Sequence, residues 1–489
     1  MRTTWLRTAR PIVNLAFVSA LAGCSMLPDM GGGSSSPLGA TVTSGVETKY
    51  ARDDIAGKKL ALDPSDSSFA GAVIADEPTA ALVARNVLEK GGNAADAATA
   101  LYFALSVTYP AAASLGGGGV CLARQGGKPE VESIAFLTRR PLEGGSIAVP
   151  GNVRGFALLQ ARYGSKSWSE IVSPAERLAA TGVPVSRAMA HQLGESAVMI
   201  GNSPDLRRSF ARPDGTAYQE LDTFSPAALA GTLAHIRSRG VAGFYEGETG
   251  RILIAESRTK GGSLSASDLV NYRPEVSPAQ QIAVGELNVM LPARNLGAGV
   301  FAGTLWSNIQ GASGAAALTA AAERTAIALG ARSGPALEGD YGSTSFVTVD
   351  SKGGAVACSV TMNGAFGATR TADGTGVVFA ATPEAVVKGL GSAFLVPVMV
   401  VKANSSTGLY VAGAGAGAPK GGAAIESVVA GALTGNEGAA ASALASGPAD
   451  ARSPANAIVC PQGLPAGACS IHVSPKGFGV GFGAVAAGS

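Results

Sequence analysis

The stretch that decides the fold reads Gly342-Ser-Thr-Ser-Phe-Val-Thr-Val-Asp350, followed after a short gap by Ala355-Val-Ala-Cys-Ser-Val-Thr-Met-Asn363. Both segments consist mainly of small, β-branched and apolar residues, and the sequence between them, Asp350-Ser-Lys-Gly-Gly354, is typical of a turn. We therefore predict a buried β-hairpin whose first strand begins with a hydroxyl residue, Ser343. A cut before such a residue would create an N-terminal nucleophile.

Further strands and helices are predicted on both sides of this hairpin. Towards the N-terminus the pattern indicates a strand at 72–75, helices at 78–90 and 93–107, and a strand at 120–123 after the glycines 116–119. The region 155–305 is predicted to be mainly helical, with amphipathic segments at 171–180, 225–238 and 250–259. An alanine-rich helix at 312–329 leads into a polar connection at 331–340, and strands follow at 376–380, 395–401 and 408–412. This distribution predicts an α+β fold.

The composition is that of a well-buried globular protein. Hydrophobic residues make up 46% of the 489 residues, charged residues make up 15%, and the 67 glycines show no period. The formal net charge is only +2, and no basic run with interleaved aromatic residues occurs, so we expect no nucleic-acid partner. The three histidines lack ligand spacing and no Cys-x-x-Cys pair is present, so no metal or cofactor is expected.

The N-terminal segment resembles a bacterial lipoprotein signal. Three arginines precede the apolar run 12–21, and Leu21-Ala-Gly-Cys24 closes it, which predicts a signal peptide at 1–24 and a lipid anchor on Cys24. The alternative is an uncleaved membrane span, but this run of about ten residues is shorter than the roughly twenty that a bilayer requires. Ser25 fits sorting to the periplasmic side of the outer membrane in a Gram-negative cell. Residues 25–70 would then form a flexible tether and lead-in.

In an oxidising compartment the remaining cysteines could form disulfides. Cys460 and Cys469 flank a loop rich in proline and glycine and are the best candidates for a pair. Cys121 and Cys358 lie on predicted apolar strands, and we expect them to be buried free thiols.

The hairpin motif resembles the start of the small subunit of gamma-glutamyltranspeptidases. The residues that carry this resemblance are Ser343-Thr-Ser-Phe-x-x-Val-Asp350, Ala355-Val-Ala-x-x-x-Thr-x-Asn363 and Phe366-Gly367. Motifs similar to the family's large subunit are Glu89-Lys-Gly-Gly-Asn-Ala-Ala-Asp-Ala97, Leu115-Gly-Gly-Gly-Gly119, Val149-Pro-Gly-Asn-Val-Arg-Gly-Phe156, Gly243-Phe-Tyr-Glu-Gly247 and Gly262-Ser-Leu-Ser-Ala-Ser-Asp-Leu-Val-Asn-Tyr272. The resemblance implies the four-layer αββα sandwich of N-terminal nucleophile hydrolases, with residues 71–342 corresponding to the large subunit and 343–489 to the small subunit.

This resemblance also implies a self-processing site. The precursor would cleave itself between Gly342 and Ser343, and the two subunits would stay paired. The freed α-amine, with a reference pKa of about 7.7 to 8.0, would then be the general base for its own hydroxyl. The family has threonine where this chain has Ser343, so Thr344 is a rival nucleophile. Thr361 would orient the amine or polarise the hydroxyl, and Asn363 would contact substrate, unless both only satisfy strand ends.

The family's remaining site residues are only partly present. Ala416 and Gly417 lie where the family has two glycines whose backbone N–H groups bind the oxyanion. The arginine that would hold a γ-glutamyl carboxylate aligns with Leu137, and Arg139 or Arg140 could replace it. The acidic residue that would bind the substrate amine aligns near Glu384. The family's Ser-Ser pair is replaced by Ala393-Phe394.

Three functional hypotheses follow. In the first, the chain is an acyl transferase or hydrolase that acts on γ-glutamyl amides such as glutathione-like compounds. In the second, it is an amidohydrolase of the same fold with a different acyl substrate. In the third, it is a catalytically inactive envelope lipoprotein that retains the fold. Cleavage before Ser343 discriminates an enzyme from an inactive scaffold.

Overall fold

The computed structural model describes residues 68–385, 390–436 and 438–486. The predicted signal peptide, Cys24 and nearly all of the expected tether lie outside these residues. Within the described ranges, no helix combines the length and the apolar character that crossing a bilayer requires.

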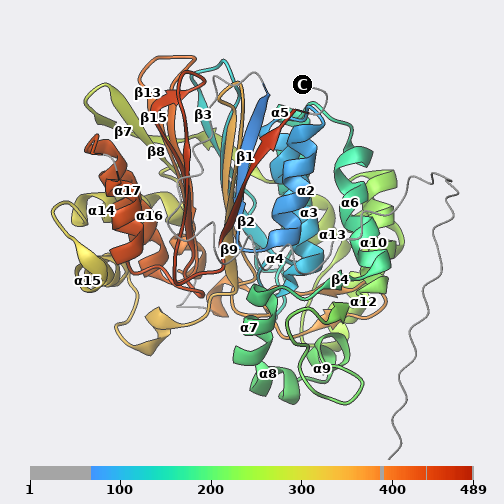
Figure 1. Cartoon of the computed structure of the whole chain (residues 1–489). Helices are drawn as coiled ribbons and strands as arrows, with labels where there is room; N and C mark the ends of the chain where they lie inside the picture. Colours follow the sequence, from blue (N-terminus) through green and yellow to red (C-terminus); the bar gives the residue numbers. More distant parts are fainter. Residues whose placement is uncertain (1–67, 386–389, 437, 487–489) are drawn as a thin grey trace, which may run out of the picture. The chain divides into compact units, whose positions relative to one another are not determined.

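Two antiparallel sheets are stacked at the centre of the described unit (Figure 1). The first sheet has seven strands in the order β17 (Val480–Val485), β1 (Phe69–Ala75), β9 (Ser343–Asp350), β10 (Ala355–Thr361), β2 (Gly118–Arg124), β3 (Val131–Ala135) and β6 (Glu275–Pro278). The second has six strands in the order β16 (Ser470–Val473), β15 (Ala455–Leu464), β14 (Leu409–Gly415), β13 (Val396–Lys402), β8 (Leu287–Leu291) and β7 (Gln280–Val284). Buried aliphatic side chains from both sheets fill the space between them.

Helices cover the outer face of each sheet. In Figure 1 the helices over the first sheet are α2 (Pro78–Glu89), α3 (Ala94–Thr108), α5 (Asn152–Tyr163), α6 (Trp168–Thr181) and α10 (Ala227–Arg239). Those over the second sheet are α14 (Gly297–Asn308), α15 (Gly314–Ala328), α16 (Pro419–Leu433) and α17 (Ala439–Ser446). The remaining helices are α4 (Pro110–Ala113), α7 (Arg187–Glu195), α8 (Ala197–Asn202), α9 (Pro204–Phe210), α11 (Ala242–Tyr245), α12 (Gly247–Thr259) and α13 (Ala266–Asn271). The predicted four-layer αββα sandwich is confirmed.

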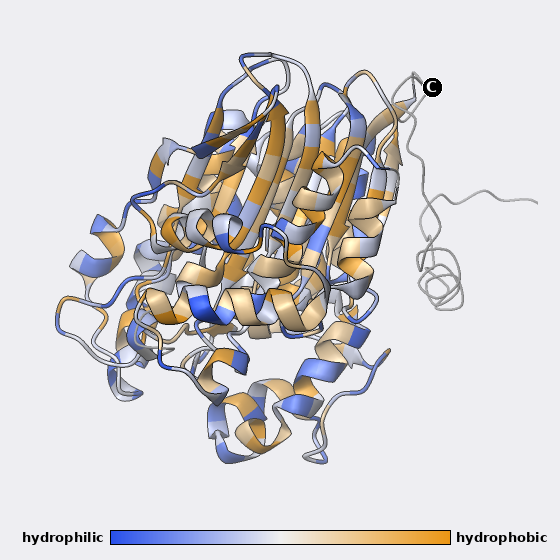
Figure 2. Ribbon diagram, turned by 90° about the vertical axis from the view of Figure 1, so that its left-hand side faces the viewer, coloured by the Kyte–Doolittle hydropathy of each residue, from blue (hydrophilic) through white to orange (hydrophobic). Residues whose placement is uncertain are grey.

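Local sequence explains how the central helix α3 forms and where it packs. Asn93 caps its N-terminus, because its side chain accepts hydrogen bonds from the backbone N–H groups of Ala95 and Asp96, and Asp96 accepts one from Asn93 in return. All fifteen residues of α3 are buried, so the helix lies wholly inside the protein. Figure 2 shows the hydrophobic residues concentrated along the strands and on the helix faces turned towards them.

The two regions on either side of Gly342 are interleaved within the sheets. In the first sheet, β9 lies between β1, which precedes Gly342 in sequence, and β10, which follows it. In the second sheet, β13 is paired with β8 in the same way. Neither region contains a complete sheet of its own.

The cysteines differ from our expectation in one pair. Cys460 and Cys469 form the predicted disulfide. The prediction that Cys121 and Cys358 are free buried thiols is wrong, because they lie directly opposite each other on β2 and β10 and form a second disulfide. Each sequence segment predicted a strand, but neither could indicate that these two strands are neighbours.

The region 155–305 is mainly helical, as predicted, but it also contains the strands β6, β7 and β8, which the sequence did not indicate. One strand prediction needs correction. The strand predicted at 376–380 is reduced to β12 (Val377–Val378), which pairs only with β11 (Thr371–Ala372). A further two-stranded pair joins β4 (Val183–Pro184) to β5 (Thr223–Phe224).

Candidate active site

The candidate site lies where the β9–β10 hairpin reaches the end of the first sheet. Ser343 pairs directly with Thr361, so their side chains share the face that looks towards the second sheet. Ser343 is 7% exposed. The carbonyl oxygen of Tyr341 accepts hydrogen bonds from Ser343 Oγ at 3.2 Å, from Thr361 Oγ1 at 2.9 Å and from the N–H of Gly364 at 2.8 Å. The two hydroxyl groups are therefore held on one acceptor beside the predicted scissile bond.

Gly342, whose carbonyl belongs to the predicted scissile bond, is held from both sides. Its N–H donates to Asp340 Oδ1 at 2.7 Å, and its carbonyl oxygen accepts the N–H of Met362 at 2.9 Å. Asp340 is in turn fixed by Gln192 Nε2 of α7 at 2.8 Å. The N–H of Met362 polarises the Gly342 carbonyl and is placed to stabilise negative charge on its oxygen.

Only glycine fits position 342. Its φ is +54°, and a Cβ there would lie 2.0 Å from the carbonyl oxygen of Gly364. We expect Gly342→Ala to slow cleavage of the 342–343 bond by about tenfold or more, because left-handed backbone costs alanine about 1–2 kcal/mol before the clash is counted. The rate at which the smaller fragment appears measures this effect.

The matched control is Gly374→Ala. Gly374 has a similar φ of +79° but nothing within 4 Å of its added Cβ. It therefore carries the backbone strain without the clash. Equal cleavage rates in the two variants would show that the contact with Gly364 is unimportant.

Asn363 is the most constrained polar side chain of the site. Its backbone is left-handed, with φ of 57°, and its N–H donates to Thr361 Oγ1 at 3.0 Å. Its Nδ2 donates to Thr138 Oγ1 and to the carbonyl oxygen of Ala381, both at 2.8 Å. Asn363 Oδ1 is buried and has no hydrogen-bond partner among the described residues. A buried acceptor without a partner is costly, so it is available to a donor group of a ligand.

Thr344 is engaged in a different network on the opposite face of β9. Thr344 Oγ1 donates to Asp76 Oδ2 at 2.7 Å, and Asn456 Nδ2 of β15 donates to Asp76 Oδ1 at 2.9 Å. Burial raises the pKa of the Asp76 carboxyl, although the bonds from Asn456 and Thr344 oppose that rise. Thr344 itself is fully buried. The two rival hydroxyls therefore point away from each other, and only that of Ser343 lies beside Thr361.

The candidate oxyanion turn follows β14 at the same end of the second sheet. Ser359 Oγ donates to the carbonyl oxygen of Gly415 at 2.9 Å, which joins the two sheets just before this turn. The N–H of Ala416 donates to the carbonyl oxygen of Pro454 at 3.1 Å, so it is already used. The N–H of Gly417 has no such partner within the described ranges. Of the two predicted donors, only Gly417 is free in this structure.

The structure does not bring Arg139 to Ser343. Arg139 is 47% exposed, and its Nη2 lies 2.8 Å from Glu275 Oε1 on the edge strand β6. Strand register places Glu275 four strands away from Ser345, or about 19 Å at a spacing of about 4.8 Å. The sequence alignment could not reveal this ion pair, because its partners are far apart in the chain.

Glu384 lies nearer to the site. It is exposed, and it follows Ala381 by three residues. Ala381 contacts the site through the amide of Asn363. Glu384 is therefore within about 10 Å of that contact along the chain.

A cluster of apolar residues packs between the sheets near Thr361. Leu137 and Leu296 are half-buried and pack against a small buried cluster. The members of this cluster, which we call the apolar wall together with the two leucines, are Val120, Ala135, Ala298, Leu395 and Ala416. Phe394 packs edge-on against Tyr341, with ring centroids 5.5 Å apart.

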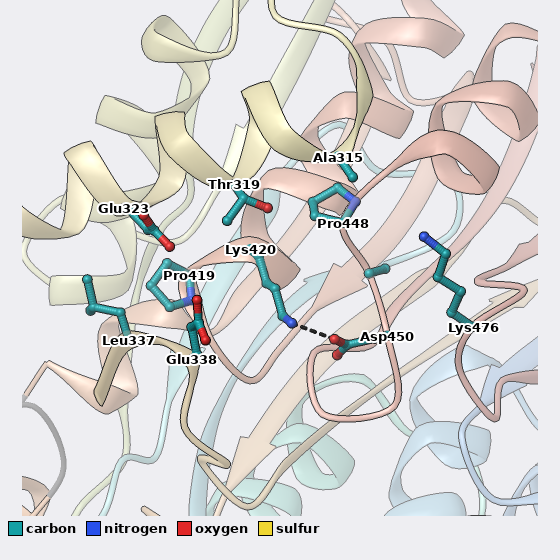
Figure 3. Close-up of a pocket in the computed structure, with 11 residues that line it drawn as sticks. Ala315, Thr319, Glu323, Leu337, Glu338, Pro419, Lys420, Pro448, Asp450 and Lys476 are labelled. Atoms are coloured by element: carbon teal, nitrogen blue, oxygen red, sulfur yellow. Dashed lines mark hydrogen bonds and ion pairs between the residues drawn. The ribbon is translucent and has the colours of Figure 1, made fainter. Parts of the chain in front are cut away.

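A separate pocket of about 210 Å³ borders the site on the other side of the oxyanion turn (Figure 3). It is lined by Leu337 and Glu338, which precede Ser343, and by Pro419 and Lys420, which follow Gly417. The side chain of Lys420 is directed to Asp450, with which it forms an ion pair. None of the predicted site residues lines this pocket.

Sequence reasoning missed the groups that position Gly342. Asp340 lies in the polar connection at 331–340, and Gln192 of α7 belongs to no recognised motif. The only local signal was Asp340 two residues before Gly342, because aspartate often accepts a hydrogen bond from the N–H two residues on. Asp76 was missed for a similar reason, since it lies in a short link between β1 and α2.

Comparisons with known proteins identify relatives of this chain. The family model of gamma-glutamyltranspeptidase matches residues 80–333, which is more than half of the chain and ends before Gly342. Scoloptoxin SSD14 from Scolopendra dehaani is 36% identical over 237 residues, 44% of this chain and 41% of the relative. The glutathione hydrolase proenzyme of Bacillus subtilis is 29% identical over 224 residues, 41% of this chain and 38% of the relative. The chain thus spans about two fifths of the length of these relatives.

The fold is shared with a solved enzyme structure. Cephalosporin acylase from Bacillus halodurans superposes with a TM-score of 0.67 at 18% identity, covering 87% of this chain and 97% of that chain. This likeness supports the αββα architecture of N-terminal nucleophile hydrolases. The match of the family model over residues 80–333 shows that the chain belongs to the gamma-glutamyltranspeptidase family.

Proposed function

We propose that this protein is a self-processing amide acyl transferase or hydrolase whose nucleophile is Ser343 Oγ. The observation that carries this proposal is the shared acceptor on Tyr341, which holds Ser343 Oγ and Thr361 Oγ1 beside the 342–343 bond. Thr344 is the weaker candidate, because its hydroxyl is bonded to Asp76 on the other face of β9. The glutathione hydrolases among the relatives support the reaction class.

Self-cleavage begins when Ser343 Oγ attacks the carbonyl carbon of Gly342. The C–O bond forms as the C–N bond breaks, and the hydroxyl proton moves to the departing nitrogen, which becomes the α-amine of Ser343. The N–H of Met362 supports the negative charge that develops on the Gly342 oxygen. Water then hydrolyses the ester, leaving a carboxylate on Gly342 and a free hydroxyl on Ser343.

Turnover uses the same hydroxyl on a substrate amide. The α-amine of Ser343 takes the hydroxyl proton while Oγ bonds to the acyl carbon, and the proton passes to the leaving amine as the C–N bond breaks. Water or a second amine then takes the acyl group from Oγ. The N–H of Gly417 and the unpartnered Asn363 Oδ1 are the groups placed to contact the substrate.

Two classes of acyl donor are compatible with this chemistry. The first is the γ-glutamyl amides that the family resemblance implies. The second is amides of a different acyl group, as in the cephalosporin acylase that shares the fold. The second class is favoured by one observation, because the position expected to carry a carboxylate-binding arginine is Leu137, in the apolar wall.

The proposal is tested by intact mass and N-terminal sequencing of the purified full chain, followed by assay on acyl anilides. A fragment that begins at Ser343, with release of aniline, supports it. A fragment that begins at Thr344 would move the nucleophile by one residue. An uncut chain that hydrolyses no anilide would contradict the proposal and favour the inactive envelope protein.

The two fragments should remain covalently joined after cleavage. The disulfide between Cys121 and Cys358 connects strands on opposite sides of the 342–343 bond. We expect the cut protein to run as one band on a non-reducing denaturing gel and as two bands after reduction. Cys121→Ala serves as the control, since it should give two bands under both conditions. Two bands without reductant in the unaltered protein would show that this disulfide is absent.

A further inference from the structure

We infer that the acyl group accepted by Ser343 is uncharged and mainly apolar, an aliphatic or aryl chain without an α-amino acid head. This inference rests on the proposed function, because it concerns the substrate of the same nucleophile. The supporting observations are the position of the apolar wall beside the nucleophile, the aliphatic side chains that form this wall, and the ion pairs of three nearby cations.

Strand register places the apolar wall next to the nucleophile. Ser343 pairs with Thr361, which pairs with Gly118 on β2. A Cβ on Gly118 would lie 2.9 Å from the carbonyl carbon of Leu137, so the chain at Leu137 lies against this glycine. Gly118 is two strands from Ser343, or about 10 Å. Asn363 also bonds to Thr138, the next residue after Leu137.

The apolar wall is contributed by segments of both sheets. Val120 and Ala135 lie on β2 and β3 of the first sheet, and Leu137 follows β3 by two residues. Leu395 immediately precedes β13 and Ala416 immediately follows β14 of the second sheet. Ala416 is adjacent to Gly417, the free donor of the candidate oxyanion turn. An acyl chain bonded to Ser343 Oγ and directed towards these residues would therefore meet mainly aliphatic carbon.

Three cations of this region are already paired with carboxylates. Arg139 is paired with Glu275 at the sheet edge. Lys420, which follows the oxyanion turn in sequence, is paired with Asp450, and Arg452, whose backbone lies against Gly417, is paired with Glu195. An α-carboxylate placed against the apolar wall would thus lose water without gaining any of these three cations as a partner, and an unpaired buried charge is strongly unfavourable. An apolar chain gains from the same burial.

The test compares p-nitroanilides of acetyl, butyryl, hexanoyl and γ-glutamyl groups on the cleaved protein. Each buried methylene should raise kcat/KM by roughly fourfold, so hexanoyl, with four more methylenes, should exceed acetyl by roughly 250-fold if all four are buried, and γ-glutamyl should be poorer still. Leu137→Arg should reverse the order, lowering hexanoyl turnover by at least tenfold and raising γ-glutamyl turnover, mainly through KM. Leu142→Arg is the matched control, because Leu142 is 83% exposed in the same segment.

A cleaved protein that prefers γ-glutamyl anilide would overturn the inference while leaving the proposed function intact. So would a Leu137→Arg variant whose preferences match those of Leu142→Arg. If Leu137→Arg does not fold, Leu137→Ala replaces it and should reduce hexanoyl turnover several-fold while sparing acetyl turnover. An uncut chain without activity on any anilide would instead refute the proposed function, and the inference with it.

Discussion

Ser343→Ala is expected to yield a single uncut chain with no amide turnover. The substitution removes the hydroxyl that, among the described residues, shares the Tyr341 carbonyl oxygen with Thr361 beside Gly342. Without cleavage no α-amine is released, so both the nucleophile and its base are lost together. Intact mass and the anilide assay measure the two consequences in one preparation.

Two further variants separate the rival hydroxyls. Ser343→Thr keeps an oxygen at the same position and should still cut before residue 343. Thr344→Val preserves shape but removes the hydrogen bond to Asp76, so it should cut normally while losing about 1–3 kcal/mol of stability. Loss of cleavage in Thr344→Val, with cleavage retained in Ser343→Ala, would assign the nucleophile to Thr344.

The second large expected effect is a pH dependence of the free energy of unfolding, caused by a buried carboxyl group that has no charge partner among the described residues. Glu426 lies on α16 and is completely buried, and neither of its carboxyl oxygens has a hydrogen-bond partner within the described part of the chain. Gly422, one turn earlier on the same helix face, contacts Phe301 and Leu305 of α14. Burial raises the pKa of the Glu426 carboxyl well above its usual value of 4.5. The folded protein therefore keeps a proton that the unfolded chain releases.

The sign of the pH dependence follows from this difference. Below about pH 4.5 both states hold the proton, and Glu426 adds no slope. As the pH rises above that value, the unfolded state loses the proton first, and the free energy of unfolding falls by about 1.4 kcal/mol per pH unit until the folded pKa is reached. Glu426→Gln should abolish this contribution, so it should be clearly more stable than the parent protein at pH 7 and similar to it at pH 4.5.

Urea unfolding between pH 4.5 and pH 8 measures this slope, with the uncut Ser343→Ala chain as the parent so that one covalent chain unfolds and refolds. The matched control is Glu338→Gln, since Glu338 is exposed. It should leave the pH profile unchanged. Identical profiles for the Glu426 and Glu338 variants would show that Glu426 is not buried as the structure places it.

The strands and turn that carry the site were predicted from the sequence more accurately than the contacts that these elements make with distant segments. The hairpin that begins at Ser343 follows from local signals, because β-branched runs and a glycine turn specify it within twenty residues. The pairing of Ser343 with Thr361 follows from the same register. The cap of α3 by Asn93 is equally local.

Contacts between residues that are far apart in the sequence could not be predicted in this way. Arg139 was proposed as a replacement for the arginine that aligns with Leu137, but Glu275 on another strand holds it at the sheet edge. The disulfide between Cys121 and Cys358 depends on β2 lying beside β10, which no local pattern encodes. The N–H of Ala416 is used because it donates to the carbonyl oxygen of Pro454, which a later segment contributes.

The position of β9 requires the intact chain to fold before it is cleaved. This strand begins at Ser343 and is hydrogen-bonded to β1 on one side and to β10 on the other. A cut before Ser343 therefore creates a new N-terminus on a strand that remains paired on both sides. Each fragment would need strands of the other to complete the first sheet. One fragment could be exchanged for a newly made copy only if that sheet were unfolded. Separately synthesised pieces should therefore fail to assemble efficiently, and the intact precursor acts as its own assembly scaffold.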